Sequence, residues 1–182
     1  MSRHTTQKLT VFVSLLSLFA VLPVLSQEHN VTVLDTDPSI TYAGTGTGPA
    51  TLCKFDAAGN VFGGQPGCYF IPSNCTSSAA MSQNLDHNAA ASFKFKGSAI
   101  YINSALFDIS PMYTVTLDGQ ATDVDGVRPS RTFICAPLFS KTGLDPAVEH
   151  TIQLSVKGPS PNRNTTTDPN GSDLGFSLID FM

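Results

Sequence analysis

Short segments in which apolar and polar residues alternate run through most of this chain, and they limit its fold more than any other feature. In Ser92–Lys96, phenylalanines alternate with lysines, so an extended strand would have one apolar and one charged side. Ile152, Leu154 and Val156 alternate in the same way. No amphipathic helix of normal length is present, and Ala79–Ala91 allows at most a short helical turn. The predicted strands are Val31–Asp35, Ile40–Tyr42, Ser92–Lys96, Ala99–Asn103, Tyr113–Leu117, Thr132–Cys135, His150–Val156 and Gly175–Phe181.

About eight strands separated by Gly, Pro, Asn and Asp turns predict an all-β antiparallel sandwich, for which a jelly roll fits best. Each sheet would have one apolar face, and the two sheets would bury these faces against each other. Tight connections are expected at Lys96–Ser98 and Asp118–Gly119. Two segments are expected to be long loops: residues 44–91, with three cysteines, and residues 157–173, which we expect to be mobile and glycosylated.

The first 26 residues have the pattern of a secretory signal peptide. Arg3 and Lys8 precede the apolar run Leu9–Leu22, and a Pro-Val-Leu-Ser cleavage segment follows. The run is shorter than the roughly 20 apolar residues that a membrane helix needs. We expect cleavage after Ser26, which leaves one domain of residues 27–182 in an oxidising, glycosylating compartment. No second apolar span follows, so the chain as given is expected to be soluble and extracellular.

The charge of the mature chain excludes two classes of partner. Without the signal peptide the chain has 8 basic and 14 acidic residues, a net charge of −6, and its lysines and arginines do not cluster. Binding to nucleic acid or to an anionic membrane depends on clustered positive charge. Neither partner is therefore expected.

Four N-glycosylation sequons agree with secretion and predict surface positions. Asn170 lies close to a predicted strand, so we expect it to be modified less reliably than the others. The four acceptor residues are Asn30, Asn74, Asn164 and Asn170.

Four cysteines in a secreted chain predict two disulfides. No C-x-x-C motif occurs and no histidine stands at ligand spacing from a cysteine, which disfavours a metal site. Cys53, Cys68 and Cys75 lie in the long loop, whereas Cys135 is at the end of a predicted strand. Because only one pair can form among three cysteines, Cys135 is expected to bond to one of them. We favour Cys75, the nearest in sequence to the core strands, which leaves a Cys53–Cys68 ring.

Peptide mapping of the secreted protein under non-reducing conditions tests this pairing. We expect Cys135 in an intrachain disulfide with a loop cysteine, because closing a ring of this size removes about 3–5 kcal/mol of chain entropy from the unfolded state. Recovery of Cys135 as an alkylated free thiol, or linked between two chains, would contradict the prediction.

Phe93–Ile102 reads Phe-Lys-Phe-Lys-Gly-Ser-Ala-Ile-Tyr-Ile and fits the pattern F-x-F-x-G-[ST]-A-[IV]-x-[IVY]. Together with several other segments, it resembles the galactose-binding-domain-like jelly rolls of secreted and membrane-anchored proteins from mushroom-forming fungi (basidiomycetes). The resemblance covers roughly residues 85–181, and Ile40–Gly44 is similar to the opening strand of the family. The other matching segments are Tyr113–Gly119, Leu138–Ser140, Gly143–Asp145, Glu149–Leu154 and Phe176–Asp180.

The resemblance implies a jelly-roll fold and, because related modules bind carbohydrate, a non-catalytic extracellular binding module. Its partner would be a polysaccharide or a glycoprotein. Many relatives continue into a transmembrane helix, so the chain is expected to be secreted, or anchored at the cell surface if Met182 ends a truncated gene model. The alternative function is a structural or adhesive extracellular protein without a small-ligand pocket. A glycan-active hydrolase ranks below both, because no G-x-S-x-G, H-E-x-x-H or P-loop motif is present.

Candidate binding residues follow from the needs of sugar recognition, which uses aromatic faces beside planar polar groups. Tyr101, with Asn103 two residues further along the same strand, is the best candidate. Alternation points Tyr101 away from its apolar neighbours, toward solvent or a covering loop. His87 could lie at the edge of a binding surface. We expect no catalytic residues and no cofactor.

Two further groups of polar residues have competing interpretations. His150 could act as a base beside Asp145 or Glu149, but we favour a structural histidine whose ring ties a strand end to a neighbouring loop. Asp118, Asp123 and Asp125 are secondary candidates for a calcium site. Asp-Gly turn chemistry explains these acids without a metal, so we expect no metal site.

Overall fold

The computed structural model describes residues 29–44, 54, 57, 80–82, 88–172 and 174–182. All regular secondary structure in this part of the chain is β-strand. The strands are β1 (Val33–Leu34), β2 (Thr41–Ala43), β3 (Ala80–Ser82), β4 (Ala90–Phe95), β5 (Ala99–Leu106), β6 (Met112–Leu117), β7 (Gln120–Asp125), β8 (Ile134–Thr142), β9 (His150–Gly158), β10 (Phe176–Leu178) and β11 (Asp180–Phe181).

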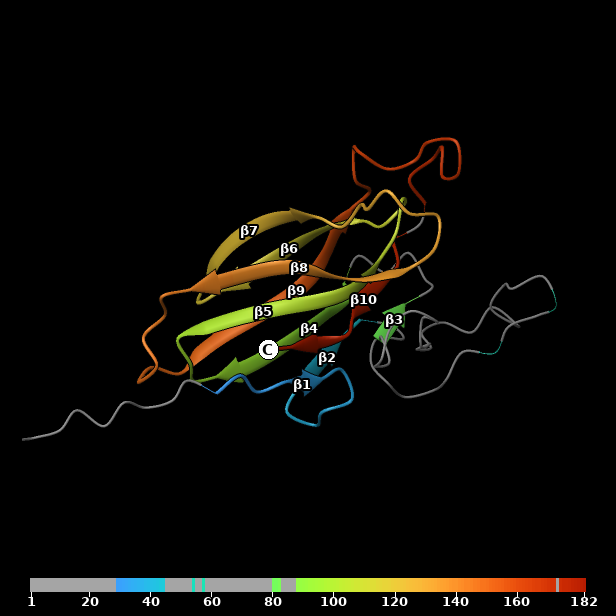
Figure 1. The fold of residues 1–182 in the computed structure, drawn as a ribbon. Coiled ribbons are helices and arrows are strands. Elements are labelled where there is room, and N and C mark those ends of the chain that lie inside the picture. Colours follow the sequence, from blue (N-terminus) through green and yellow to red (C-terminus); the bar gives the residue numbers. More distant parts are fainter. Residues whose placement is uncertain (1–28, 45–53, 55–56, 58–79, 83–87, 173) are drawn as a thin grey trace, which may run out of the picture.

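Two antiparallel sheets form the sandwich (Figure 1). Sheet A has the strand order β1-β11-β5-β8, and sheet B has the order β2-β4-β9-β6-β7. A short two-stranded sheet pairs β10 with β3. The chain changes sheet between β4 and β5, β5 and β6, β7 and β8, and β8 and β9, whereas β6 and β7 form a hairpin within sheet B. This order is that of a jelly roll, so the predicted all-β sandwich is confirmed.

The core lies between the two sheets and is made by the apolar faces that the alternation predicted. Along β9 every second residue is buried, and β6 shows the same alternation. All three residues of β10 are buried, because both faces of this strand are covered. The fully buried side chains include Ile102, Leu106, Tyr113, Ile152, Leu154, Phe176, Leu178 and Phe181.

The C-terminal strand is divided in two by an irregularity beside β5. The register of β5 against β8 shifts between Ile102 and Asn103. Ser177 fills a gap in the ladder there, because its Oγ accepts a hydrogen bond from the Ala105 N–H (2.9 Å) and its carbonyl accepts one from the Ser104 hydroxyl (2.9 Å). The Ile179 N–H then donates to the Asn103 carbonyl (2.9 Å), and regular pairing resumes in β11. Local side-chain hydrogen bonds thus keep the buried backbone satisfied.

Several strands differ from the sequence predictions, and the largest differences are at β3, β7 and β8. The sequence predicts an acidic turn where β7 lies. The strand gives no apolar alternation, since its side chains are mostly exposed and only Val124 packs against the core. β8 continues well beyond the predicted end at Cys135, because an edge strand beside a register shift tolerates Pro137. β3 and the start of β4 lie within the segment 44–91 that was predicted as a loop.

The β9–β10 loop, predicted to be mobile, is held by many hydrogen bonds of its own. The Arg163 guanidinium donates to the carbonyls of Ser160, Asp168 and Pro169 at 3.0–3.2 Å. The buried Asp168 carboxylate accepts hydrogen bonds from the amide and hydroxyl of Ser172. An arginine inside the loop thus satisfies three of its carbonyls, and the mobility of this segment stays a prediction.

The N-terminal predictions are not tested by the fold. The predicted signal peptide, residues 1–26, lies outside the described residues. Within the part of the chain that the structure describes, no helix is long and apolar enough to cross a membrane.

Gly126, at the end of the β6–β7 hairpin, offers a test of this packing. A Cβ atom at this buried position would lie 2.5 Å from the Pro111 carbonyl oxygen and 2.7 Å from a ring carbon of Tyr113. Gly126→Ala should therefore lower the free energy of unfolding by about 1–3 kcal/mol in denaturant titration. Gly97→Ala is the matched control, because its Cβ would meet no atom closer than 3.6 Å. Equal stabilities of the two variants would contradict the packing described.

A candidate binding cleft at one end of the sandwich

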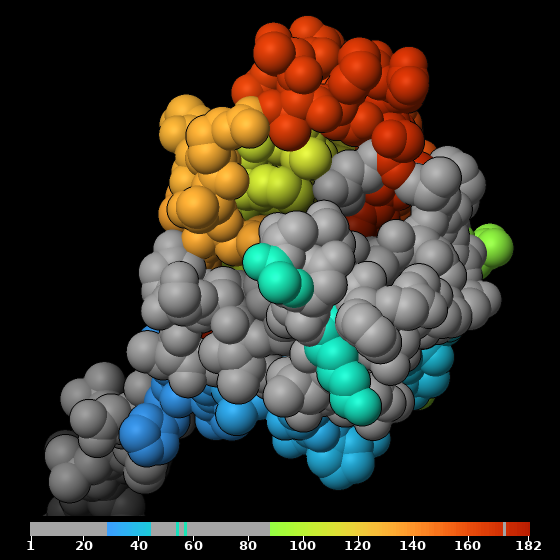
Figure 2. Space-filling model, turned by 90° about the vertical axis from the view of Figure 1, so that its right-hand side faces the viewer, coloured from blue at the N-terminus to red at the C-terminus, as the bar shows by residue number. Residues whose placement is uncertain are grey.

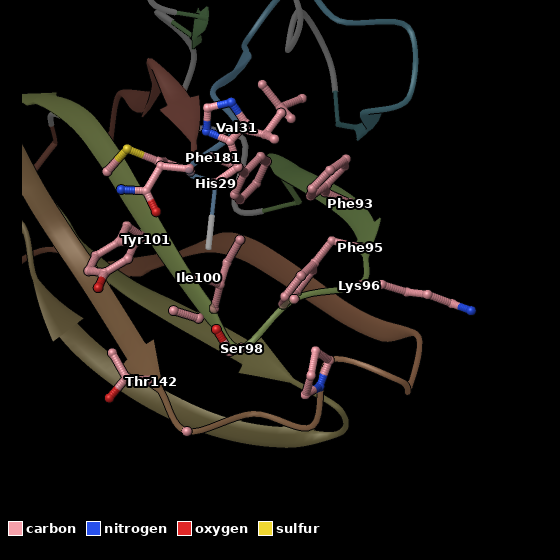
Figure 3. Close-up of a pocket in the computed structure, with 17 residues that line it drawn as sticks. His29, Val31, Phe93, Phe95, Lys96, Ser98, Ile100, Tyr101, Thr142 and Phe181 are labelled. Atoms are coloured by element: carbon pink, nitrogen blue, oxygen red, sulfur yellow. The ribbon is translucent and has the colours of Figure 1, made fainter. Parts of the chain in front are cut away.

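A cleft of about 850 Å³ opens at the end of the sandwich where β4 turns into β5 (Figure 3). Its size is within the range of small-molecule sites. Four parts of the chain line it: the end of β4 with the start of β5, the end of β11, the segment leading into β1, and the β8–β9 connection. The Lys96–Ser98 turn, predicted as a tight connection, joins strands of different sheets and so places residues of both at the cleft.

Aromatic rings form one wall of this cleft. Phe93 and Phe95 are half-buried and nearly parallel, with ring centroids 6.1 Å apart and an interplanar angle of 7°. Phe93 also stacks on the fully buried Phe181, at 5.3 Å and 15°. Because Phe93 belongs to sheet B and Phe181 to sheet A, the stack joins the two sheets where the cleft begins. The arrangement gives the cleft an apolar wall with a rigid base.

Polar groups lie around this apolar wall. Tyr101 lies on the opposite side of the cleft from Phe93 and Phe95, with Ile100 between them (Figure 3). Asn30 and Thr142 also line the cleft and supply an amide and a hydroxyl. Lys96 lines it as well, but its side chain extends away from the rings (Figure 3).

Of the predicted ligand-binding residues, the structure places Tyr101 in the cleft. Tyr101 is half-buried, and its backbone pairs with Met182, which also lines the cleft. Asn103 is not among the lining residues, and its amide donates to an Asp180 carboxylate oxygen at 2.7 Å. Burial raises the pKa of Asp180, and this hydrogen bond opposes the rise. His87 lies outside the described residues.

The sequence did not identify Phe93 and Phe95 as lining residues of a cleft. Alternation assigned both to the core, and both do pack against it. The signal that could have revealed their exposure is their place in the last three residues of a strand before a tight turn, where the core covers the side chains only in part. Asn30 was identified as a sequon but not as a residue of the cleft.

His150 has the structural role that the sequence favoured. Its ring is almost fully buried, with Nδ1 2.7 Å from an Asp118 carboxylate oxygen and Nε2 3.0 Å from the Asp145 carbonyl oxygen. Both neighbours are hydrogen-bond acceptors, so only the protonated ring donates to both. These bonds, led by the one to Asp118, raise the pKa of His150. The ring also lies against Phe95, at a centroid distance of 5.3 Å, and so supports the wall of the cleft.

The three candidate calcium ligands have separate protein partners. Asp118 accepts from the Thr151 N–H (2.8 Å) and contacts His150, and these two hydrogen bonds lower its pKa. Asp123 pairs with Lys157 and accepts from the Thr114 hydroxyl, whereas Asp125 accepts from Asn162. Among the described residues, no group of three or more His, Cys, Asp or Glu could hold a metal ion. The structure therefore does not bring these acids together.

The described sequons differ in their surroundings. Asn30 and Asn170 are exposed, whereas Asn164 is half-buried and its amide donates to the buried Asp108 carboxylate at 2.7 Å. Asn74 lies outside the described residues. The expectation that Asn170 is modified less reliably than the other sequons stays a prediction.

Among the predicted disulfide cysteines, the structure describes only Cys135. It is disulfide-bonded, and its partner lies outside the described residues. Cys53, Cys68 and Cys75 also lie outside them, so the pairing stays a prediction.

No family model and no curated protein matches this chain. Among solved structures, it is similar to a Paenibacillus cycloisomaltooligosaccharide glucanotransferase complexed with cycloisomaltoheptaose, at 12% identity and a TM-score of 0.46 over 85% of this chain and 18% of that one. A two-domain esterase active on acetylated mannans is similar at 10% identity and a TM-score of 0.47, over 83% of this chain and 34% of that one. The same esterase co-crystallised with mannopentaose gives equal identity and TM-score, with 35% of that chain covered. The chain thus spans about a third or less of these proteins.

The pKa of His150 predicts how stability depends on pH. Because folding raises this pKa above its ordinary value of 6.5, the stabilisation is complete below about pH 6.5 and is lost as the pH rises through the higher, folded-state pKa. The melting temperature should therefore fall over the neutral to alkaline range, from about pH 6.5 upward, and His150→Gln should remove much of this dependence. His29→Gln, at an exposed histidine of the cleft, is the control and should keep it. A wild-type melting temperature that is constant over this range would contradict the prediction.

Proposed function

We propose that this protein is a secreted, N-glycosylated, non-catalytic module that binds carbohydrate in the cleft at the β4–β5 end of the sandwich. The observation that supports this most is the combination of an aromatic wall with amide and hydroxyl groups around it. A sugar ring has apolar C–H faces and hydroxyl edges, so it needs both kinds of surface. Phe93, Phe95 and Tyr101 offer the first, while Asn30 and Thr142 offer the second.

The construction of the cleft also supports binding without large rearrangement. Phe93 is fixed by its stack on the buried Phe181, and Phe95 lies between Phe93 and His150. His150 is in turn held by Asp118 and by the carbonyl of Asp145. Groups that are already fixed before binding lose little conformational entropy when a ligand arrives.

The groups that line the cleft favour binding over hydrolysis. Glycoside hydrolysis generally uses two carboxyl groups on either side of the scissile bond. The described lining residues of the cleft supply aromatic, apolar, amide, hydroxyl, imidazole and ammonium groups. The sequence resembles galactose-binding-domain-like modules, in which the fold serves carbohydrate binding. This resemblance is an analogy of fold, and it also favours binding over hydrolysis.

A glycan array probed with the secreted protein tests the proposal. We expect binding to at least one polysaccharide or oligosaccharide class, and Tyr101→Ala should weaken it about tenfold or more, which corresponds to about 1.4 kcal/mol. Tyr101→Phe keeps the ring and should retain most of the affinity if the ring face makes the contact.

The control for this experiment is Gln153→Ala, at an exposed position in β9 of sheet B, away from the cleft. It should bind like the wild type. Silence of the folded protein across polysaccharides and oligosaccharides, both with its N-glycans and after their removal, would contradict the proposal. The structural or adhesive alternative would then be favoured.

A further inference from the structure

Asn30 combines two properties that meet nowhere else in the described part of the chain. It is the acceptor of the Asn30-Val31-Thr32 sequon, and it lines the cleft. Both Asn30 and Thr32 are exposed. A transferase that reads the sequon could therefore reach them, and a sugar attached to the Asn30 amide would start at the wall of the cleft.

The modification would leave the sugar covalently fixed at this place. In N-glycosylation the Asn30 amide nitrogen forms a bond to the anomeric carbon of an oligosaccharide carried by a diphospholipid. The bond between that carbon and the phosphate oxygen breaks, the diphospholipid leaves with the bonding electrons, and the amide nitrogen loses one proton. The first sugar residues would then lie next to the cleft that we propose for carbohydrate.

We propose that a glycan on Asn30 occupies this cleft and competes with external carbohydrate, so that the modified protein caps its own binding site. This inference rests on the proposed function, because the capping glycan and the external ligand belong to the same chemical class. A group tethered by a short linker has an effective concentration of about millimolar. Even modest affinity of the cleft for its own glycan would thus keep it occupied.

The other described sequons would not act in this way. Asn164 and Asn170 both lie in the β9–β10 loop, and neither lines the cleft. Figure 2 shows this loop (red) and the segment leading into β1 (blue) at opposite ends of the molecule. A glycan on Asn170 would therefore leave the cleft open, which makes Asn170 the matched control position.

The test compares four proteins produced in a glycosylating secretory host: wild type, Asn30→Gln, Thr32→Ala and Asn170→Gln. Mass spectrometry of glycopeptides measures the occupancy of each sequon. Affinity is then measured for the glycan that gives the strongest array signal. Thr32→Ala removes the sequon but keeps the Asn30 amide in the cleft wall, so it separates the effect of the glycan from that of the side chain.

We expect Asn30 to carry a glycan in the wild type, and Thr32→Ala to bind the external glycan about tenfold more tightly than the wild type. This is the factor that an effective concentration of about 1 mM gives against an intrinsic Kd of about 0.1 mM. Asn30→Gln also removes the glycan, but it changes a lining side chain of the cleft, so its gain in affinity should be no larger. Asn170→Gln should bind like the wild type. An unmodified Asn30 in the wild type would overturn the inference, as would equal affinities of wild type and Thr32→Ala.

A second measurement does not require an external ligand. In the glycosylated wild type, nuclear Overhauser contacts should join protons of the Asn30 glycan to the rings of Phe93, Phe95 or Tyr101. Their absence would overturn the capping inference even if the cleft binds external sugar. If these contacts are present while no external glycan binds to Thr32→Ala, the proposed function fails and the position of the glycan stands.

Discussion

The stacking of Phe93 on Phe181 connects the two sheets, and much of the rest of the structure depends on it. Phe93 belongs to β4 of sheet B and Phe181 to β11 of sheet A, and their rings lie 5.3 Å apart and nearly parallel. Phe181 reaches this position because β11 inserts between β1 and β5. The last strand of the chain thus packs against a strand more than eighty residues earlier in the sequence and completes the core. It also sets one wall of the cleft.

Polar contacts between distant segments hold the two ends of the sandwich. At the cleft end, His150 joins the β6–β7 turn, through Asp118, to the β8–β9 connection, through the Asp145 carbonyl. At the other end, the buried Asp108 accepts hydrogen bonds from Arg131 and Asn164 and so ties the β9–β10 loop to the segment after β5. Buried polar groups of this kind are costly when unpaired, so each network favours one arrangement of its loops.

The candidate cleft follows from the way the strands end. Phe95 closes β4, and the chain crosses at once into β5 of the other sheet. Side chains near such a crossover have apolar neighbours on one side and open space on the other. Phe93 and Phe95 therefore pack against the core on one side and line the cleft on the other. This arrangement suits a site that needs rigid aromatic groups.

The sequence by itself determined the fold class and most of the strands, because alternation with period two leaves each strand with one apolar face, and two such faces bury best against each other. It also identified the Asp118–Gly119 hairpin turn, where both residues have positive φ, and the structural role of His150. Only the tertiary structure decided that β7 is a strand, since an exposed edge strand needs backbone hydrogen bonds and few apolar side chains. It alone placed Asn30 and Tyr101 in the lining of one cleft and left Asn103 outside that lining, because the distance between side chains on different strands depends on register and crossover. Alternation along one strand carries no information about either.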